Sequence, residues 1–600
     1  MAQTLIEKII SAHSRAEVKP GDTVDVKIDT RVARDFGGAN VVKNLQRAGL
    51  GIDDPERTLF TFDCNPGGSD QGYAANQQFC RVFARSHGVP LRDITEGIGT
   101  HLAIDEGRVW PGSTFVSTDS HANIMGALGA FGQGMGDQDI AAAFAAGSVW
   151  FRVPPSVKVV LKGLPDAKAT AKDLVLEMAR QLGAKGLLGR AAEIYGEAAE
   201  ALDLAGRITV SSMATEMGGI IALFPPSEEI VSFCSQTTGR DVEFLAADPD
   251  AHYEDVIEVD VEGLLPMIAR PGHPEDVVPV SELAGRKIDS VFIGSCTNGR
   301  IEDLRAAVRV MAGRKVAPGV VLKVVPATRV VWTQALEEGL IEELMAAGAL
   351  VGNAGCAGCA AGQIGQNGPG EVTISTGNRN FAGKQGKGEV YLASPETAAA
   401  SAVAGVICSV DAIPAQAVEF EIGGGRLPVI ADTPQKETDG GSKPTVLTGR
   451  VWVIDRDNVD TDMIFHNRYL AITEVAEMGR YTFDNLEGWE DFATRAKPGD
   501  IVVLGANFGC GSSRQQAVDC FASLGDQAVI AVSLGAIYER NAINAGMPVV
   551  VADAVSAGLE NGVEITVDLV TGTIKWPGGK VQGQPFSDVQ MEIYQRGGLL

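Results

Sequence analysis

Three cysteines lie among unusually small neighbours. Cys296 occurs in the segment GSCTNGR, directly after the apolar run 289–294, and Cys356 and Cys359 form a C-x-x-C pair within GNAGCAGCAAG. Glycine and alanine let backbone amides approach a bulky anionic group and donate to its sulfurs. Three thiolates can hold three corners of a [4Fe–4S] cluster and leave one iron without cysteine, and such an iron acts as a Lewis acid.

The spacing alone leaves other interpretations open. A zinc site would need a fourth ligand, and a lone C-x-x-C pair in a chain with nine cysteines is often incidental. Thioredoxin-like chemistry is a further option, but this pair sits in a Gly/Ala segment without the expected start of a helix.

The elements around Cys296 alternate between strand and helix patterns. Residues 289–294, 320–325 and 372–376 have the pattern of buried strands, and 300–314 and 330–349 have helical spacing. This alternation predicts a mainly parallel sheet covered by helices. In such sheets the sites lie beyond the carboxyl ends of the strands.

A segment without apolar periodicity divides the chain. Residues 423–445 contain GGG and DTPQKETDGGSKPT and have the composition of a flexible linker. A second β/α pattern follows and predicts a C-terminal domain over 446–600. Its predicted strands are 446–454, 500–504, 528–532 and 548–551, and its predicted helices are 514–524 and 536–545.

Length and charge exclude several function classes. A chain of 600 residues is too long for one compact core. With 50 basic and 76 acidic residues the net charge is −26, which disfavours binding to nucleic acid and to anionic membranes. We see no export or membrane segment. Nine cysteines, an odd number, favour a reducing compartment, so we expect a cytoplasmic protein.

Several motifs, taken together and in order, carry a family resemblance. They are DSH at 119–121, GQGMGDQD, GSCTNGR, GCAGC, NRNFAGKQGKG and ANFGCGSSRQQA. On these motifs the chain is identified as a member of the aconitase superfamily, and its NFGCGSS form resembles the isopropylmalate isomerase and homoaconitase branch. The two parts that are often separate subunits are here fused, with the large part first.

The resemblance implies the fold and its division. We expect an α/β protein with a three-domain aconitase-like core, whose parallel sheets surround an iron–sulfur site, and a C-terminal swivel-type β/α domain. The expected scheme is domains 1 and 2 over 1–285, domain 3 with the cluster cysteines over 286–422, a linker over 423–445 and the swivel domain over 446–600. A monomer or small homo-oligomer is expected.

The resemblance also implies the chemistry: a [4Fe–4S] cluster on Cys296, Cys356 and Cys359, and the reversible loss of water from a small hydroxy-di- or tricarboxylate. Ser512 matches the family's catalytic base, and Arg379 and Arg514 would hold substrate carboxylates. Without the other motifs, GSSR would be an ordinary helix N-cap and the arginines solvated surface charges.

The other implied catalytic residues are His101 and His121, which handle the leaving hydroxyl, Asp119 and Asp63, which orient them, and Glu216, close to the substrate oxygen at iron. The other implied substrate-binding residues are Ser120, Asn378, Lys384, Arg468 and Ser513. Asp462 would support the site, and residues 466–471 would set which substituent of the substrate fits.

Two departures from the family pattern affect specificity. Where the family commonly has Asp-His, this chain has Asp63-Cys64, and where the family has NRNFxGR it has Lys384. Fewer planar and hydrogen-bonding anchors favour a hydroxy-dicarboxylate, as in 3-isopropylmalate dehydration. The alternatives are homoaconitase or aconitase activity on a tricarboxylate, and a maleate-, citraconate- or dimethylmalate-type hydratase. The acidic charge disfavours an RNA-binding regulator, and metal analysis would identify a zinc module.

Overall fold

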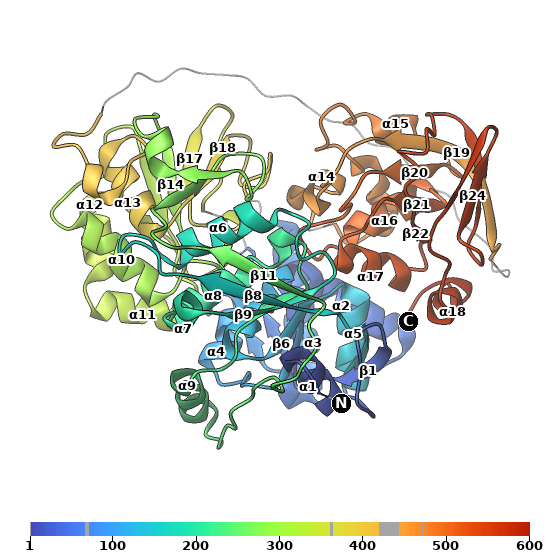
Figure 1. The fold of residues 1–600 in the computed structure, drawn as a ribbon, viewed down its shortest axis with the longest axis horizontal. Helices are drawn as coiled ribbons and strands as arrows, with labels where there is room; N and C mark the ends of the chain where they lie inside the picture. Colours follow the sequence, from blue (N-terminus) through green and yellow to red (C-terminus); the bar gives the residue numbers. More distant parts are fainter. Residues whose placement is uncertain (1, 66–70, 360–363, 419–442, 471, 600) are drawn as a thin grey trace. The chain divides into compact units, whose positions relative to one another are not determined.

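The computed structural model describes residues 2–65, 71–359, 364–418, 443–470 and 472–599, with the backbone alone for residues 71 and 359. The chain divides into two compact units (Figure 1). Unit 1 comprises Met1–Gly38, Ile52–Gln133 and Ala146–Gly425, and unit 2 comprises Ala39–Gly51, Gly134–Ala145 and Arg426–Leu600. Most of the predicted linker, 423–445, lies outside the described residues.

The first sheet of unit 1 has five strands in the order β4-β3-β2-β5-β6. They are β2 (Thr30–Arg34), β3 (Thr58–Thr61), β4 (Leu91–Arg92), β5 (Thr114–Ser117) and β6 (Phe131–Gly134). The central strand β2 runs parallel to β3 and to β5, with Arg34 opposite Thr61 and Val32 opposite Ser117. Because the three strands are parallel and buried, their carboxyl ends meet at one edge.

The second sheet has four parallel strands in the order β10-β9-β8-β11. They are β8 (Ser156–Lys162), β9 (Ala191–Tyr195), β10 (Ile221–Leu223) and β11 (Asp255–Asp260). Helices α6 (Ala171–Leu182) and α8 (Leu204–Ser212) share its apolar core, since Leu176, Met178 and Val210 pack in one cluster with Val157 and Val159. Helix α6 begins in a capping box made by Thr170 and Asp173.

The third sheet has seven strands in the order β13-β12-β18-β17-β14-β15-β16. They are β12 (Met267–Ala269), β13 (Val277–Pro279), β14 (Ser290–Ile293), β15 (Val321–Val324), β16 (Leu350–Val351), β17 (Val372–Ser375) and β18 (Glu389–Leu392). The five strands from β18 to β16 are parallel to their neighbours, as the sequence predicts for this region.

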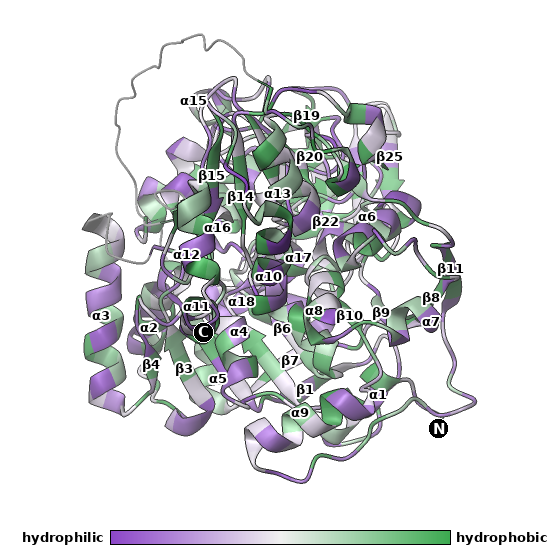
Figure 2. Cartoon of the chain, turned by 90° about the vertical axis from the view of Figure 1, so that its left-hand side faces the viewer, coloured by the Kyte–Doolittle hydropathy of each residue, from purple (hydrophilic) through white to green (hydrophobic). Residues whose placement is uncertain are grey.

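Helices α10 (Ile301–Met311), α11 (Arg329–Glu337), α12 (Leu340–Ala347) and α13 (Pro395–Ala404) cover the third sheet. On α10 the residues Ile301, Leu304, Val308 and Met311 are buried, which is the spacing of one helix face. Figure 2 shows the same mixture of hydrophobic and hydrophilic residues along the helices, for example on α3 (Gln71–His87). The helix predicted over 330–349 is instead two helices, because Gly339 adopts a left-handed conformation between them.

The remaining helices and strands of unit 1 are shorter or peripheral. They are α1 (Leu5–Ala12), β1 (Thr23–Lys27), α4 (Gly99–Asp105), β7 (Ser148–Arg152), α7 (Glu197–Glu200) and α9 (Glu228–Thr238). Strands β1 and β7 form an antiparallel pair. Within the described residues, no helix is both long enough and apolar enough to cross a membrane.

Unit 2 contains a seven-stranded sheet in the order β22-β21-β20-β19-β23-β24-β25. Its parallel half is β19 (Val446–Ile454), β20 (Ile501–Leu504), β21 (Ala528–Ala531) and β22 (Val549–Val551). Its antiparallel half is β23 (Glu564–Asp568), β24 (Thr573–Trp576) and β25 (Gly579–Gln582). Its main helices are α16 (Gln516–Leu524), α17 (Ala536–Asn544) and α18 (Asp588–Arg596). The four strands and two helices predicted after residue 445 are confirmed, whereas the antiparallel half was not predicted.

Candidate active site

Loops at the carboxyl ends of parallel strands carry the chemical groups of unit 1. Cys296 follows β14, Cys356 follows β16, and Asn378 and Arg379 follow β17. Strand β14 pairs in parallel with both β15 and β17, and β15 pairs in parallel with β16. The four residues therefore lie at the same edge of the third sheet.

The described cysteines of this edge are buried and reduced. Cys296 and Cys356 pack in one apolar cluster with Ile98 and Ala327, and neither is in a disulfide. Ser295 and Ala357, next to them in the chain, have φ of 80° and 45°. Such left-handed backbone costs free energy in residues with a side chain and is typical of functional loops. The backbone of Cys359 lies in the short helix η5 (Ala357–Cys359), and its side chain lies outside the described residues.

A buried histidine contacts the first cysteine loop. His101, in helix α4, places Nε2 3.0 Å from the carbonyl oxygen of Cys296. Burial lowers the pKa of His101 to about 4, so the imidazole is neutral at neutral pH. If Nε2–H donates to that carbonyl, Nδ1 carries the free lone pair. Nδ1 is buried and has no hydrogen-bond partner among the described residues.

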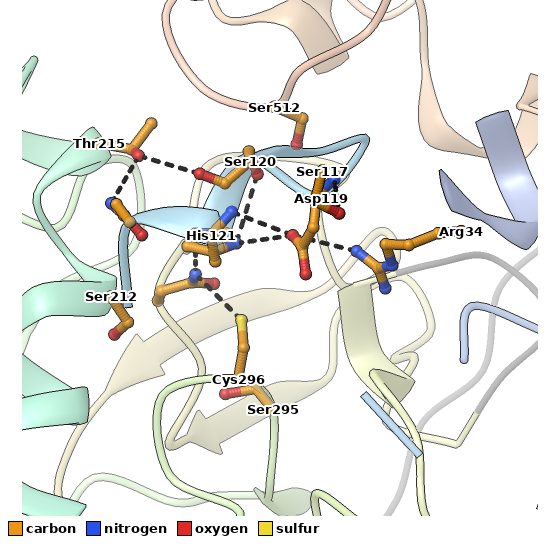
Figure 3. A network of polar contacts seen from close by, with 12 residues as sticks. Arg34, Ser117, Asp119, Ser120, His121, Ser212, Thr215, Ser295, Cys296 and Ser512 are labelled. Atoms are coloured by element: carbon orange, nitrogen blue, oxygen red, sulfur yellow. Dashed lines mark hydrogen bonds and ion pairs between the residues drawn. The ribbon is translucent and has the colours of Figure 1, made fainter. Parts of the chain in front are cut away.

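The DSH segment forms a second polar group beside the same loop (Figure 3). Asp119 Oδ1 accepts a hydrogen bond from the backbone N–H of His121 at 3.0 Å, and Oδ1 lies 3.7 Å from His121 Nδ1. Asn378 Nδ2 lies within hydrogen-bond distance of His121 Nε2 and 3.8 Å from Cys296 Sγ. Figure 3 shows this chain of contacts from Asp119 through His121 to the cysteine.

Glu216 and Arg379 complete this group. Arg379 Nε donates to Glu216 Oε1 at 2.7 Å, and the same oxygen lies 3.4 Å from His121 Nε2. Burial raises the pKa of Glu216, but Arg379 and His121 outweigh burial and lower it to about 2. Burial and Arg379 lower the pKa of His121, but Asp119 and Glu216 outweigh them and raise it. The site thus favours a Glu216 carboxylate beside a cationic imidazole.

Sequence reasoning missed a buried arginine beside the two aspartates. Arg34 Nε donates to Asp63 Oδ1 at 2.7 Å, and Nη1 lies 3.1 Å from Asp119 Oδ1. Burial lowers the pKa of Arg34, but the carboxylates of Asp119 and Asp63 outweigh burial and raise it. Arg34 occupies the last position of strand β2. The available signal was a charged residue at the carboxyl end of a strand that the fold buries on both faces.

Lys172 is a second buried, charged residue next to this group that sequence reasoning missed. Its Nζ is buried and donates to the carbonyl oxygens of Thr376 and Gly377 at 3.1 and 2.6 Å. These carbonyls directly precede Asn378 and Arg379, so the lysine holds the loop that presents both side chains. Burial lowers the pKa of Lys172 to about 7. A fully buried lysine is rare, and this was the signal that only the structure could supply.

Several buried polar atoms of this group have no partner among the described residues: Arg34 Nη2, His101 Nδ1, Asp119 Oδ2 and Glu216 Oε2. An unpaired buried polar atom costs about 1–3 kcal/mol. Functional sites are a common reason for such atoms, since a bound polar molecule satisfies them.

The other predicted residues of unit 1 are also placed. Ser120 Oγ lies 3.4 Å from Arg379 Nη2, Lys384 is buried, and Asp63 Oδ2 accepts from the backbone N–H of Gly99 at 3.0 Å. Burial raises the pKa of Asp63 to about 6. Of the predicted residues, the structure therefore brings Asp119, Ser120, His121, Glu216, Asn378, Arg379 and Cys296 into one contact network.

Unit 2 holds a second group of predicted residues. Ser512, Ser513 and Arg514 lie in the turn between β20 and α16. Arg514 is buried, pairs with the buried carboxylate of Asp462 and places Nη2 3.5 Å from Ser512 Oγ. Arg468, over a third exposed, pairs with Asp484 at 2.6 Å. Of the predicted specificity segment 466–471, residue 471 lies outside the described residues.

Two family models match most of the chain, including these loops at the strand ends. The model for the aconitase family (aconitate hydratase) matches residues 7–405, and the model for the aconitase C-terminal domain matches 462–554. The fold is that of an aconitase-type α/β hydro-lyase. The chain belongs to the aconitase family.

Individual relatives agree with this assignment. The chain is 39% identical over 411 residues to the 3-isopropylmalate dehydratase large subunit 1 of Methanopyrus kandleri, covering 68% of this chain and 98% of that protein. It is 42% identical over 410 residues to the homoaconitase large subunit of Thermus thermophilus, covering 68% and 97%. A solved 3-isopropylmalate dehydratase from Methanocaldococcus jannaschii is 34% identical, covers 26% of this chain and 90% of its own, and has a TM-score of 0.24.

The coverage confirms the predicted fusion. Proteins named large subunits match about two thirds of the chain over nearly their whole length, and the C-terminal family model matches residues 462–554. Aconitase-family hydro-lyases are generally iron–sulfur enzymes that act on small-molecule acids.

Proposed function

We propose that this protein is a [4Fe–4S]-dependent hydro-lyase that dehydrates and rehydrates a hydroxy-dicarboxylic acid of the 3-isopropylmalate type. The observation that supports it most is the set of unpartnered buried atoms of His101, Asp119 and Glu216 beside the Cys296 loop. These three atoms are hydrogen-bond acceptors, and the donors His121 and Arg379 lie in the same network, so the site holds both the acceptors and the donors that the removal of water from a hydroxy acid requires. Relatives named 3-isopropylmalate dehydratase large subunit support the substrate class.

The residues present fit the cluster. Cys296 and Cys356 are buried thiols in an apolar pocket, which is the donor type that iron–sulfur clusters take. At Gly358, between the two cysteines of the C-x-x-C pair, an added Cβ would lie 2.3 Å from Gln385 Nε2, so a side chain there would require the Gln385 side chain to move. Cys296, Cys356 and Cys359 would hold the cluster. When bound, it supplies a Lewis acid for the substrate hydroxyl and carboxylate.

The protein's own side chains would move the protons. Ser512 would take the proton from the carbon beside a carboxylate, and the neighbouring Arg514 guanidinium would stabilise its anionic form. His121, held as a cation by Asp119 and Glu216, would donate a proton to the leaving hydroxyl. Neutral His101 would accept a hydrogen bond at Nδ1 from the released water.

Substrate carboxylates would be held by arginine. Arg379 and Arg514 present planar guanidinium groups that bind carboxylates bidentately, and Lys384 adds a point charge. Glu216 now occupies Arg379 Nε, so an anionic substrate would share that guanidinium with Glu216. The further proposed contacts are Ser120, Asn378, Arg468 and Ser513. We keep the domain scheme 1–285, 286–422 and 446–600 as part of the proposal.

Homoaconitase activity is the second candidate. The observation that favours it is the 42% identity to the homoaconitase large subunit of Thermus thermophilus. A homoaconitase substrate would bring a third carboxylate, which needs one more cationic or hydrogen-bonding partner when it is buried.

A substrate panel separates the candidates. Anaerobically reconstituted enzyme is assayed for kcat/KM with 3-isopropylmalate, 2-methylmalate, homoisocitrate and isocitrate on one preparation. We expect a dicarboxylate to be turned over best. Homoisocitrate or isocitrate ranking first would contradict the dicarboxylate assignment, and no turnover of any of the four by an iron-loaded enzyme would contradict the hydro-lyase site itself.

A further inference from the structure

The five-stranded sheet places one arginine between two aspartates from neighbouring strands. Strand β2 lies between β3 and β5, and all three run parallel. Asp63 follows β3 and Asp119 follows β5, so each carboxylate lies beyond a different neighbour of β2. Arg34 ends β2 and reaches Asp63 with Nε at 2.7 Å and Asp119 with Nη1 at 3.1 Å. One planar group therefore joins the ends of both neighbouring strands.

The same guanidinium keeps one nitrogen unused. Arg34 is 5% exposed, and its Nη2 has no hydrogen-bond partner in the described ranges. Figure 3 shows Arg34 beside Asp119, whose other oxygen, Oδ2, is also buried and unpartnered there. Nη2 is a donor without an acceptor and Oδ2 is an acceptor without a donor, so a substrate carboxylate would satisfy Nη2 and a substrate hydroxyl would satisfy Oδ2.

At position 64 the chain has a cysteine, which offers a substrate carboxylate no imidazole donor. The Asp63–Asn65 turn is fixed by Asp35, which accepts from the backbone N–H groups of Cys64 and Asn65 at 3.0 Å each. The Cys64 thiol is buried and donates to Asp63 Oδ1 at 3.4 Å. Burial raises the pKa of this thiol well above its usual range, so it offers an anion neither charge nor a second donor. The positive charge next to Cys64 comes from Arg34, and Asp35 and Asp63 place carboxylates there as well.

We propose that Arg34 is a substrate-binding residue of this site: its Nε and Nη1 fix Asp63 and Asp119, and its Nη2 donates to a substrate carboxylate in place of a side chain at position 64. This inference rests on the proposed function, because it assigns a carboxylate substrate to the site. It adds Arg34 to Arg379, the guanidinium anchor already proposed in unit 1.

A neighbouring arginine provides the matched control. Arg31 lies on the same strand, is 1% exposed and pairs with Asp53 at 3.0 Å, but it contacts neither Asp63 nor Asp119 in the described structure. Two of its nitrogens are also unpartnered, so Arg31 tests whether a buried arginine matters only for folding. Arg34→Lys and Arg31→Lys each keep the charge and remove the planar fork.

Binding and turnover are measured on iron-loaded enzyme. Calorimetric titration with succinate, an unreactive dicarboxylate, reports binding, and kcat and KM are taken for the best substrate of the panel. For Arg34→Lys we expect the Kd of succinate and the KM of the substrate to rise about tenfold or more, as for a lost charge-assisted hydrogen bond. For Arg31→Lys both values should stay within about twofold of the wild type. In Arg34→Gln, adding Cys64→His should restore part of the succinate affinity by supplying an imidazole donor.

The outcomes distinguish this inference from the proposed function. If wild-type enzyme prefers a tricarboxylate, the substrate assignment fails, and the Arg34 comparison is made with that substrate instead. If Arg34→Lys folds and binds succinate as Arg31→Lys does, the inference is overturned even when kcat falls, because the loss of a carboxylate anchor must weaken binding. If Arg34→Lys does not fold, the same affinity comparison is made between Arg34→Gln and Arg31→Lys.

Discussion

Replacing Lys172 by methionine tests whether the buried ammonium organises the Asn378–Arg379 loop. Lys172→Met keeps the length and apolar stem of the side chain and removes the group that donates to the carbonyls of Thr376 and Gly377. Because these carbonyls directly precede Asn378, their release should loosen both predicted substrate-binding side chains. The expected result is a loss of activity without a large loss of stability.

The magnitude follows from two opposing terms. The pKa of Lys172 falls from 10.5 to about 7, so burying the charged form costs about 5 kcal/mol, and the variant removes this cost. The variant also leaves two buried carbonyls unpaired, which costs about 2–6 kcal/mol in total. The two terms nearly offset, so at pH 7 the free energy of unfolding should change by only a few kcal/mol in either direction.

The pH dependence gives the sign. Between pH 7 and 10.5 the unfolded state binds the Lys172 proton and the folded state does not, so the stability of the wild type rises with pH in this window. The variant lacks this rise. From pH 7 to pH 9 the wild type should therefore gain about 2–3 kcal/mol relative to Lys172→Met.

Two assays separate the loop from the fold. Hydrogen exchange of the peptide 372–384 should speed up in Lys172→Met, and kcat/KM should fall tenfold to about a hundredfold, the scale expected for a displacement of about 1 Å. Lys158→Met is the control, since Lys158, on β8, lies over the ring of Tyr195 on β9 and has no described contact with this loop. Normal kcat/KM, or lost activity with unchanged exchange at 372–384, would refute the reasoning.

Three further predictions follow from single contacts. Cys296→Ser should abolish the cluster absorbance and lower the bound iron from about four per chain. The control Cys234→Ser, at a buried cysteine in α9, should keep the wild-type absorbance and iron content. Stoichiometric zinc in wild-type protein would contradict the cluster assignment. Burial lowers the pKa of His13, but Asp29, 2.8 Å away, outweighs burial and raises it. His13→Asn should therefore lower the free energy of unfolding by about 1 kcal/mol at pH 5.5 and by less at pH 9, where the imidazole is neutral. An equal loss of thermal stability at both pH values would contradict the ion pair. Asp462→Asn removes the buried partner of Arg514 and should destabilise unit 2 by about 3–5 kcal/mol and raise KM. The control Asp484→Asn, whose partner Arg468 is over a third exposed, should lower the free energy of thermal unfolding by under about 1 kcal/mol. Similar losses in the two variants would contradict the difference in burial.

Apolar periodicity predicted the helices and strands that have a clearly buried apolar face. Strand β14, helix α10 and the parallel strands of unit 2 follow from buried runs with turn residues after them. The break at Gly339 was not predicted, because the apolar pattern continues across it while the backbone turns left-handed. The short antiparallel strands β24 and β25 were missed because half-exposed strands carry few apolar residues.

Site residues could be predicted only where a motif surrounds them. His121 and Asn378 lie within motifs, and the structure joins them through one hydrogen bond although they are far apart in the chain. Arg34 and Lys172 lie outside the motifs, and their importance comes from burial and from partners in distant segments, Asp119 and Thr376. A sequence does not display such pairings, since they depend on which strands become neighbours.

The Arg34 assignment changes the argument about specificity. Cys64 and Lys384 remove an imidazole and a planar fork, and on that count alone the site should favour two carboxylates over three. In our proposal, Arg34 Nη2 supplies a hydrogen-bond donor that replaces the missing imidazole at Cys64. It does not replace the planar group that is missing at Lys384. The deficit is therefore confined to the carboxylate that we propose Lys384 holds, where a point charge would replace two parallel hydrogen bonds. A third carboxylate left unpaired in a buried site would cost several kcal/mol, so the preference for a dicarboxylate should depend on position 384 and not on position 64. Lys384→Arg should then raise kcat/KM for isocitrate relative to 3-isopropylmalate, and Cys64→His should leave this ratio nearly unchanged.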